Sequence, residues 1–167
     1  PHEVTFLKPD WAMPDKDVTR QLRILWALHV TGGVTEAETL TLLKHDSEYV
    51  RAWAIQLAFE DKNPSDALLK EMARMARDDK SPFVRLYIAA AMQRTPVNKR
   101  RDTLVALLGH AEDADDHNLP LMYWYAAEPL VGKDTTSAVM LLGKTKIPKI
   151  RTFITRRMTA GKKVAGK

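Results

Sequence analysis

The chain contains no cysteine. This excludes disulfide bonds, zinc sites with cysteine ligands, a cysteine nucleophile and a CxxCH haem-attachment site within its 167 residues. No hydrophobic run approaches the roughly 20 residues of a membrane span, and no secretory signal peptide is recognisable. Phosphate-binding glycine loops, HExxH and GxSxG are absent as well. We therefore expect no membrane span, no cofactor and no familiar catalytic centre in this chain.

Acidic residues are missing from the C-terminal part of the chain. The net charge is +5, but residues 144–167 hold nine Lys or Arg and no Asp or Glu. The remaining residues carry 17 basic and 21 acidic side chains, a net charge of −4. Nucleic-acid binders usually carry their positive charge on a folded face. This distribution argues against nucleic acid and favours protein as the partner.

Three parts of the chain differ in composition. Residues 1–16 contain three prolines and no periodic pattern, which predicts an extended lead-in. Residues 17–158 predict one folded domain, and residues 159–167 a frayed basic tail. The chain begins with Pro1 rather than methionine, so we expect it to be part of a longer protein. The sequence does not specify the oligomeric state.

Apolar residues between positions 17 and 158 recur in short segments with the helical period. Thr35 and Glu38 form a capping-box pattern, and Ser81-Pro82 places an N-cap before a proline at the first helical position. No segment alternates as a strand would. We predict an all-α fold of about nine helices in four to five pairs. The segments are 17–30, one that starts near Thr35, 47–60, 66–77, 83–94, 97–109, 118–130, 134–142 and 147–158.

A repeated string underlies these helices. DSEYVRAWAIQLA and KSPFVRLYIAAAM align at their Val-Arg pairs, so that Arg51 and Arg85 lie 34 residues apart. Arg151 lies 66 residues beyond Arg85, and Arg23 lies 28 residues before Arg51. In the slot between Arg85 and Arg151 we place Pro120-Leu121. Because Arg23, Arg51, Arg85 and Arg151 recur at repeat spacing, we interpret them as structural residues.

A period in the low thirties, with one helix pair per unit, is typical of an α-solenoid. A polar loop followed by an apolar-Arg pair and an alanine-rich helix resembles the HEAT repeat. The resemblance implies a right-handed α-α superhelix of the HEAT/armadillo type. The arginines would reach the polar inter-helix turns, where Asp46 and Asp79 are suitably placed. A binding surface would lie on the concave face lined by the second helix of each pair.

A closer resemblance covers most of the chain. LRILWALHVTGG, VRAWAIQLAFED, SPFVRLYIAAAMQR, HAEDADDHNLPLMYWYAAEPLV and IPKIRTFITRR resemble the HEAT-repeat region of large membrane-bound dehydrogenase-like proteins of planctomycetes and related bacteria. Those proteins join a sugar-dehydrogenase-like β-propeller, a HEAT region and a c-type haem segment with CxxCH. The resemblance implies a scaffold between redox modules and an exported or periplasmic protein. The chain itself lacks the propeller and CxxCH.

The stretch HAEDADDHNLPLMYWYAAEPL, residues 110–130, concentrates residues that can carry chemistry. The metal-site candidates are His110, Glu112, Asp113, Asp115, Asp116 and His117. Carboxylates suit calcium, but the EF-hand pattern is absent, and the spacing of the two histidines matches no familiar zinc site. We favour a solvated inter-helix loop with an Asp or Asn cap on the next helix. With Leu121 in an arginine slot, the loop carboxylates would lack an internal partner.

The aromatic run after this loop has two interpretations. Residues 122–125 could form a stacking platform for nucleic acid. Consecutive residues spread around a helix, so we favour a core role for Leu121, Trp124 and Tyr125, with Tyr123 partly exposed.

Three hypotheses on function follow. We favour a non-catalytic HEAT-repeat interaction or scaffold module of a larger bacterial redox protein. The alternative is a nucleic-acid-binding module that resembles the HEAT-like alkylpurine DNA glycosylases, with the basic terminus, Trp124 and Asp116 as its features. A third is a metal-binding regulatory module that uses the acidic loop.

Overall fold

A computed structural model describes residues 17–160 of the chain. The lead-in predicted for residues 1–16 and the tail beyond Ala160 lie outside the described residues. The described part forms nine α-helices: α1 (Val18–Val30), α2 (Glu36–Leu42), α3 (Glu48–Ala58), α4 (Asp66–Asp78), α5 (Pro82–Arg94), α6 (Arg101–Leu107), α7 (Leu119–Lys133), α8 (Thr135–Lys144) and α9 (Pro148–Ala160). It contains no strand and no helix long and apolar enough to span a membrane. The prediction of an all-α fold is confirmed.

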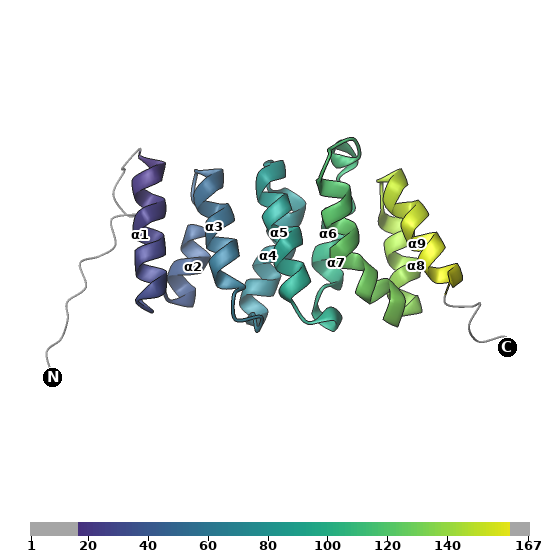
Figure 1. Cartoon of the computed structure of the whole chain (residues 1–167), viewed down its shortest axis with the longest axis horizontal. Helices are drawn as coiled ribbons and strands as arrows, with labels where there is room; N and C mark the ends of the chain where they lie inside the picture. Colours follow the sequence, from purple (N-terminus) through teal and green to yellow (C-terminus); the bar gives the residue numbers. More distant parts are fainter. Residues whose placement is uncertain (1–16, 161–167) are drawn as a thin grey trace, which may run out of the picture.

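The helices stand in two layers that progress along the chain. Each odd-numbered helix packs beside the next odd-numbered one, from α1 to α9. In the other layer α4 packs beside α6 and α6 beside α8. Figure 1 shows the resulting row, in which colours follow one another from purple to yellow. Each helix therefore contacts mainly helices one or two positions away along the chain, as expected of a helical-repeat protein.

Local signals set most of the helix boundaries. The capping box is present, because the Thr35 hydroxyl accepts from the Glu38 N–H while the Glu38 carboxylate accepts from the Thr35 N–H. Ser81 caps α5 through the Val84 N–H, with Pro82 at the first helical position. Helix α1 ends at Val30, and Gly32 then takes a φ of 72°, which glycine adopts without steric cost.

Helices α6 and α7 are two of those that differ from their predicted lengths. The segment predicted as one helix over 97–109 is split into a 3₁₀ turn, Val97–Lys99, and the short helix α6. The split occurs where the Arg100 side chain turns inward onto the carbonyls that end α5. Helix α7 ends at Lys133, three residues past its predicted end, and it contains Pro129. A proline lacks the N–H that would bond the carbonyl four residues earlier, so the helix continues at the loss of one backbone bond.

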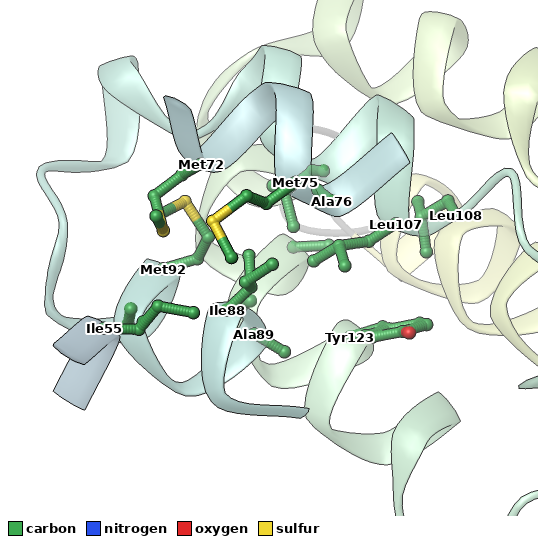
Figure 2. Close-up of a cluster of buried hydrophobic side chains, with 14 of the residues drawn as sticks. Ile55, Met72, Met75, Ala76, Ile88, Ala89, Met92, Leu107, Leu108 and Tyr123 are labelled. Atoms are coloured by element: carbon green, nitrogen blue, oxygen red, sulfur yellow. The ribbon is translucent and has the colours of Figure 1, made fainter. Parts of the chain in front are cut away.

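The core lies between the two layers. Figure 2 shows Met72 and Met75 of α4 beside Ile88 and Met92 of α5, all of them buried. Leu107 and Leu108 continue this cluster. Small residues let the odd-numbered helices approach closely, and those that are buried are Ala52, Ala54, Ala89, Ala91, Ala126 and Ala127. The shared core fixes the positions from which the loops between helices present their polar side chains.

Candidate functional site

Arg51 joins two successive inter-helix loops. Its Nε and Nη2 donate to the two carboxylate oxygens of Asp79 at 2.8 and 3.0 Å. Its Nη1 donates to the carbonyls of His45 and Asp46 at 2.8 and 2.9 Å. The guanidinium on α3 thus bonds the loop before its own helix and the loop before α5. Asp79 supplies its carboxylate, whereas Asp46 supplies only its carbonyl.

Arg85 repeats this arrangement one unit further along. Its Nε and Nη2 donate to Asp113 at 2.8 and 2.5 Å, and its Nη1 donates to the Asp79 carbonyl at 3.0 Å. In both repeats the carboxylate lies 28 residues after the arginine and a carbonyl lies six residues before it. The side chains of Arg85 and Asp113 are only 4% and 3% exposed, so this ion pair is buried.

Burial and pairing act in opposite directions on Arg85. Desolvation alone would lower the pKa of the guanidinium, but the hydrogen bond and the charge of Asp113 outweigh it and raise that pKa. The guanidinium therefore stays charged, and its contact with Asp113 is bidentate, the geometry in which an arginine binds a carboxylate most strongly.

The other two repeated arginines make fewer contacts. Arg151 is exposed and donates from Nη2 to the carbonyl of Thr145, six residues before it, at 3.0 Å. Within residues 17–160 no carboxylate pairs with it. Arg23 is exposed on α1, and no hydrogen bond or ion pair links its side chain to another described residue. The sequence repeat thus yields a complete bridge at Arg51 and Arg85, a partial one at Arg151 and none at Arg23.

The loop residue that supplies the carbonyl is also held by a repeated turn. Asp79 accepts the N–H of Ser81 through its carboxylate at 3.0 Å. In the corresponding places, His45 Nδ1 accepts from the Ser47 N–H, and the Thr145 hydroxyl accepts from the Ile147 N–H. Three different side chains form the same two-residue turn. This turn directs the carbonyl towards the arginine.

The arginine slot of α7 is occupied by Tyr123, and its assignment to Leu121 is wrong. Arg85 and Arg151 each lie three residues after a proline, and Tyr123 lies three residues after Pro120. Burial agrees with this register. In α5 the buried residues include Arg85, Ile88, Ala89 and Met92, and 38 residues later they include Tyr123, Ala126, Ala127 and Leu130. The loop before α7 is longer than the earlier loops, so Tyr123 lies 38 residues after Arg85, whereas Arg51 and Arg85 are 34 residues apart.

Tyr123 binds the same carboxylate as Arg85. Its hydroxyl donates to Asp113 Oδ2 at 2.6 Å. Burial, followed by the hydrogen bond and charge of Asp113, raises the pKa of the phenol, which keeps its proton and remains a donor. Asp113 therefore has two buried donors. The expectation that the loop carboxylates lack an internal partner is wrong for this residue.

The predicted orientation of the aromatic run is also wrong. Tyr123 is fully buried, whereas Tyr125 is 54% exposed. Leu121 and Trp124 are half-buried, and the Trp124 ring lies 5.4 Å from that of Phe153 on α9. Residues three and four apart share a helix face, and the face that includes Tyr123, Ala126 and Ala127 is the one that packs inward. The four consecutive residues form no common stacking platform.

The other candidates in the acidic loop have different surroundings. Asp116 Oδ1 accepts the N–H groups of Asn118, the N-cap residue of α7, and of Leu119, its first residue, both at 2.8 Å. It thus binds free N–H groups at the start of the helix, as expected of an Asp before a helix. These two bonds lower the pKa of Asp116. His110 lies 2.7 Å from the Ala76 carbonyl through Nε2 and 2.6 Å from Glu112 through Nδ1. This bond to His110 lowers the pKa of Glu112. Asp115 and His117 are exposed.

These surroundings separate the candidate metal ligands. Asp113 faces Arg85 and Tyr123, Asp116 faces the first turn of α7, and His110 faces the carbonyl at the end of α4. Among residues 17–160 no group of three or more His, Asp or Glu side chains is arranged to hold a metal ion. The loop thus connects α4, α5 and α7.

Sequence reasoning missed a second buried arginine, Arg100. Its guanidinium donates to the carbonyls of Gln93, Thr95 and Ala126 at 2.8–3.0 Å. Desolvation lowers its pKa, and among residues 17–160 its guanidinium is bonded by carbonyl groups without a carboxylate. The carbonyls at the end of α5 carry the negative end of the helix dipole, which favours a cation there. The sequence did contain a signal for this role. Arg100 and Arg101 stand at the start of a helix, where the helix dipole disfavours basic residues unless their side chains bind other groups.

Comparison with known proteins assigns no relative. No family model, no curated protein and no solved structure matches the chain.

We predict that Asp113 carries far more stability than its exposed neighbour Asp115. Asp113→Ala leaves the buried Arg85 charge without its carboxylate, and such a loss costs about 3–5 kcal/mol of unfolding free energy. Asp115→Ala removes an exposed carboxylate and is expected to cost less than about 0.5 kcal/mol. Urea unfolding followed by circular dichroism measures both. Equal effects of the two substitutions would show that the pair does not stabilise the fold.

We predict that Asp116 makes stability depend on pH on the acidic side. Its pKa is lowered in the folded chain, so its contribution is present above the unfolded-state value of about 3.9 and is lost as pH falls through the folded pKa. Asp116→Asn retains a side chain that can accept these bonds but has no titrating group. Urea unfolding at a series of pH values should give a steeper acid loss in the wild type than in this variant. Parallel curves would contradict the assignment.

Proposed function

We propose that the chain is a non-catalytic HEAT-like module that holds or spaces other parts of a larger bacterial redox protein. The observation that supports this proposal is that the carboxylates best suited to catalysis are bound by other side chains of the chain. Asp113 is occupied by Arg85 and Tyr123, and Asp79 is occupied by Arg51. A general acid or base must reach the proton of a substrate. These carboxylates instead join one repeat to the next.

The redox context is supported by the family resemblance and by chemistry that the chain cannot supply. With no cysteine, it has no covalent CxxCH haem of its own. Electron transfer would belong to a haem segment elsewhere in the parent protein, and oxidation of the substrate to a propeller. The module would set the distance and orientation of these parts. Its compartment would be the periplasm or another exported location, as in the proteins that it resembles.

The gene that encodes the chain tests this context. We predict an open reading frame with a β-propeller coding region upstream of this segment and a CxxCH motif downstream. The measurement is the sequence of the complete reading frame, with haem staining of the expressed protein as a check. A reading frame with neither feature would refute the redox context, although it would leave the helical-repeat fold unaffected.

A second function, recognition of damaged DNA, is favoured by one observation. Helix α9 exposes Lys149, Arg151 and Arg156, which could contact phosphates. However, the aromatic and carboxylate residues that this function needs make other contacts. Trp124 packs against Phe153, and Asp116 binds N–H groups at the start of α7. A glycosylase must stack and hold a flipped base. Trp124 and Asp116 do not line a common pocket that could do so.

Base release from an alkylated duplex separates the two functions. We predict that the full chain releases no alkylpurine above background, and that Asp116→Asn and the control Asp115→Asn behave like the wild type. Product would be measured by cleavage of the abasic strand at two salt concentrations, because phosphate contacts weaken steeply with salt. Release that Asp116→Asn abolishes while Asp115→Asn retains it would establish the glycosylase function and refute the scaffold proposal.

A further inference from the structure

A groove runs along the layer of even-numbered helices. It lies between α4 and α6, extends to the end of α2 and to the loop before α9, and has a volume of about 1190 Å³. This is the layer of second helices, where the sequence placed any binding surface. Its lining is Leu40, Lys44, Ala67, Lys70, Glu71, Ala73, Arg74, Arg77, Asp102, Val105, Ala106, Gly109, His110, Glu112 and Lys146. No other described element covers it.

The floor of the groove consists of small and apolar side chains. Val105 and Ala106 come from α6, Ala67 and Ala73 from α4, and Leu40 from α2. All five are at least partly accessible to solvent, unlike the core residues of the same helices. Apolar surface on a polar-rimmed groove is a feature of sites that bind other proteins.

The rim of the groove carries an excess of positive charge. Five Lys or Arg face three Asp or Glu among the lining residues. Arg74 is bound to Glu71 at 2.6 Å, and Arg77 to Asp78 at 3.1 Å. Lys44, Lys70 and Lys146 are exposed, and none forms an ion pair within the described part of the chain. A ligand can therefore reach three cations, of which Lys44 also acts through its charge on Glu71.

This combination suits a protein better than a nucleic acid. A nucleic-acid channel tracks the phosphate backbone with continuous positive charge, whereas Glu71, Asp102 and Glu112 interrupt the charge of this groove. Apolar residues on the floor would contribute nothing to phosphate binding. A segment with carboxylates on one side and apolar side chains on the other satisfies both the rim and the floor.

We propose that this groove docks an acidic, amphipathic segment of a partner protein. Its carboxylates bind Lys44, Lys70 and Lys146, and its apolar side chains lie on Val105 and Ala106. The inference rests on the proposed interaction function and names the surface and the partner class for it.

Binding of synthetic peptides to the full chain tests the proposal. The probe is a fluorescein-labelled amphipathic peptide of about 15 residues with Glu on its polar face and Leu on its apolar face, the pattern of a helix that lies in a groove. Comparison probes are the same peptide with Gln for Glu, the same peptide with Ser for Leu, and a single-stranded oligonucleotide. Fluorescence anisotropy gives the dissociation constants at two salt concentrations.

Two triple variants form a matched pair. Lys44→Glu, Lys70→Glu and Lys146→Glu reverse the rim, whereas Arg23→Glu, Lys149→Glu and Arg156→Glu make the same change of net charge on the odd-numbered helices. We expect the rim reversal to weaken binding of the acidic peptide at least about tenfold, and the control triple to change it less than about twofold. The Gln and Ser peptides should both bind the wild type at least about tenfold more weakly than the acidic peptide.

Four outcomes overturn the groove proposal. Equal loss in both triple variants indicates unspecific attraction of opposite charge. Equal binding of the acidic and Gln peptides, or tighter binding of the oligonucleotide, identifies a different ligand class. Absence of binding to the wild type removes the site. If circular dichroism shows that the rim reversal does not fold, Lys→Gln at the same three positions replaces it. The proposed scaffold function is tested separately by the reading frame, so the two failures are distinguishable.

Discussion

The buried contact of Arg85 with Asp113 is the constraint on which the rest of this structure depends. It is bidentate, almost completely shielded from water and shared with the Tyr123 hydroxyl. A buried pair of this kind adds modest net stability when compared with apolar packing, but the loss of one partner is costly. The pair therefore favours one arrangement of the loop before α7 relative to α5. The loop before α7 has a fixed place only where Asp113 meets both donors.

The preceding repeat contains an ion pair of the same kind, between Arg51 and Asp79, so each repeat is joined to the next one along the chain. Arg51 and Arg85 each bind a carbonyl of their own loop and a carboxylate of the following loop. Asp79 takes part in two links, through its carboxylate to Arg51 and through its carbonyl to Arg85. Packing between α-helices tolerates some sliding, whereas a bidentate ion pair does not. These bridges thus set the register between repeats that share a continuous apolar core.

Much of the fold could be predicted from the sequence, because its signals are local. Helical periodicity, the Thr35 capping box and Ser81-Pro82 depend on residues a few positions apart, and each is present as predicted. The candidate site was harder to predict because its contacts are not local. Nothing in the string KSPFVRLYIAAAM indicates that the partner of Arg85 lies 28 residues later in an acidic loop. Pro120 was a usable signal, since it precedes Tyr123 as Pro82 precedes Arg85.

The acidic loop, a candidate metal site by its sequence, thus connects successive repeats, and the candidate binding surface stays in the layer of even-numbered helices, where the sequence placed it. The most direct test of this view is a double-mutant cycle with Arg85→Met and Asp113→Asn, measured by urea unfolding. We predict a coupling free energy of at least about 1.5 kcal/mol, as found for close charge pairs shielded from water. Additivity within about 0.5 kcal/mol would contradict the claim that this pair holds the repeats in register.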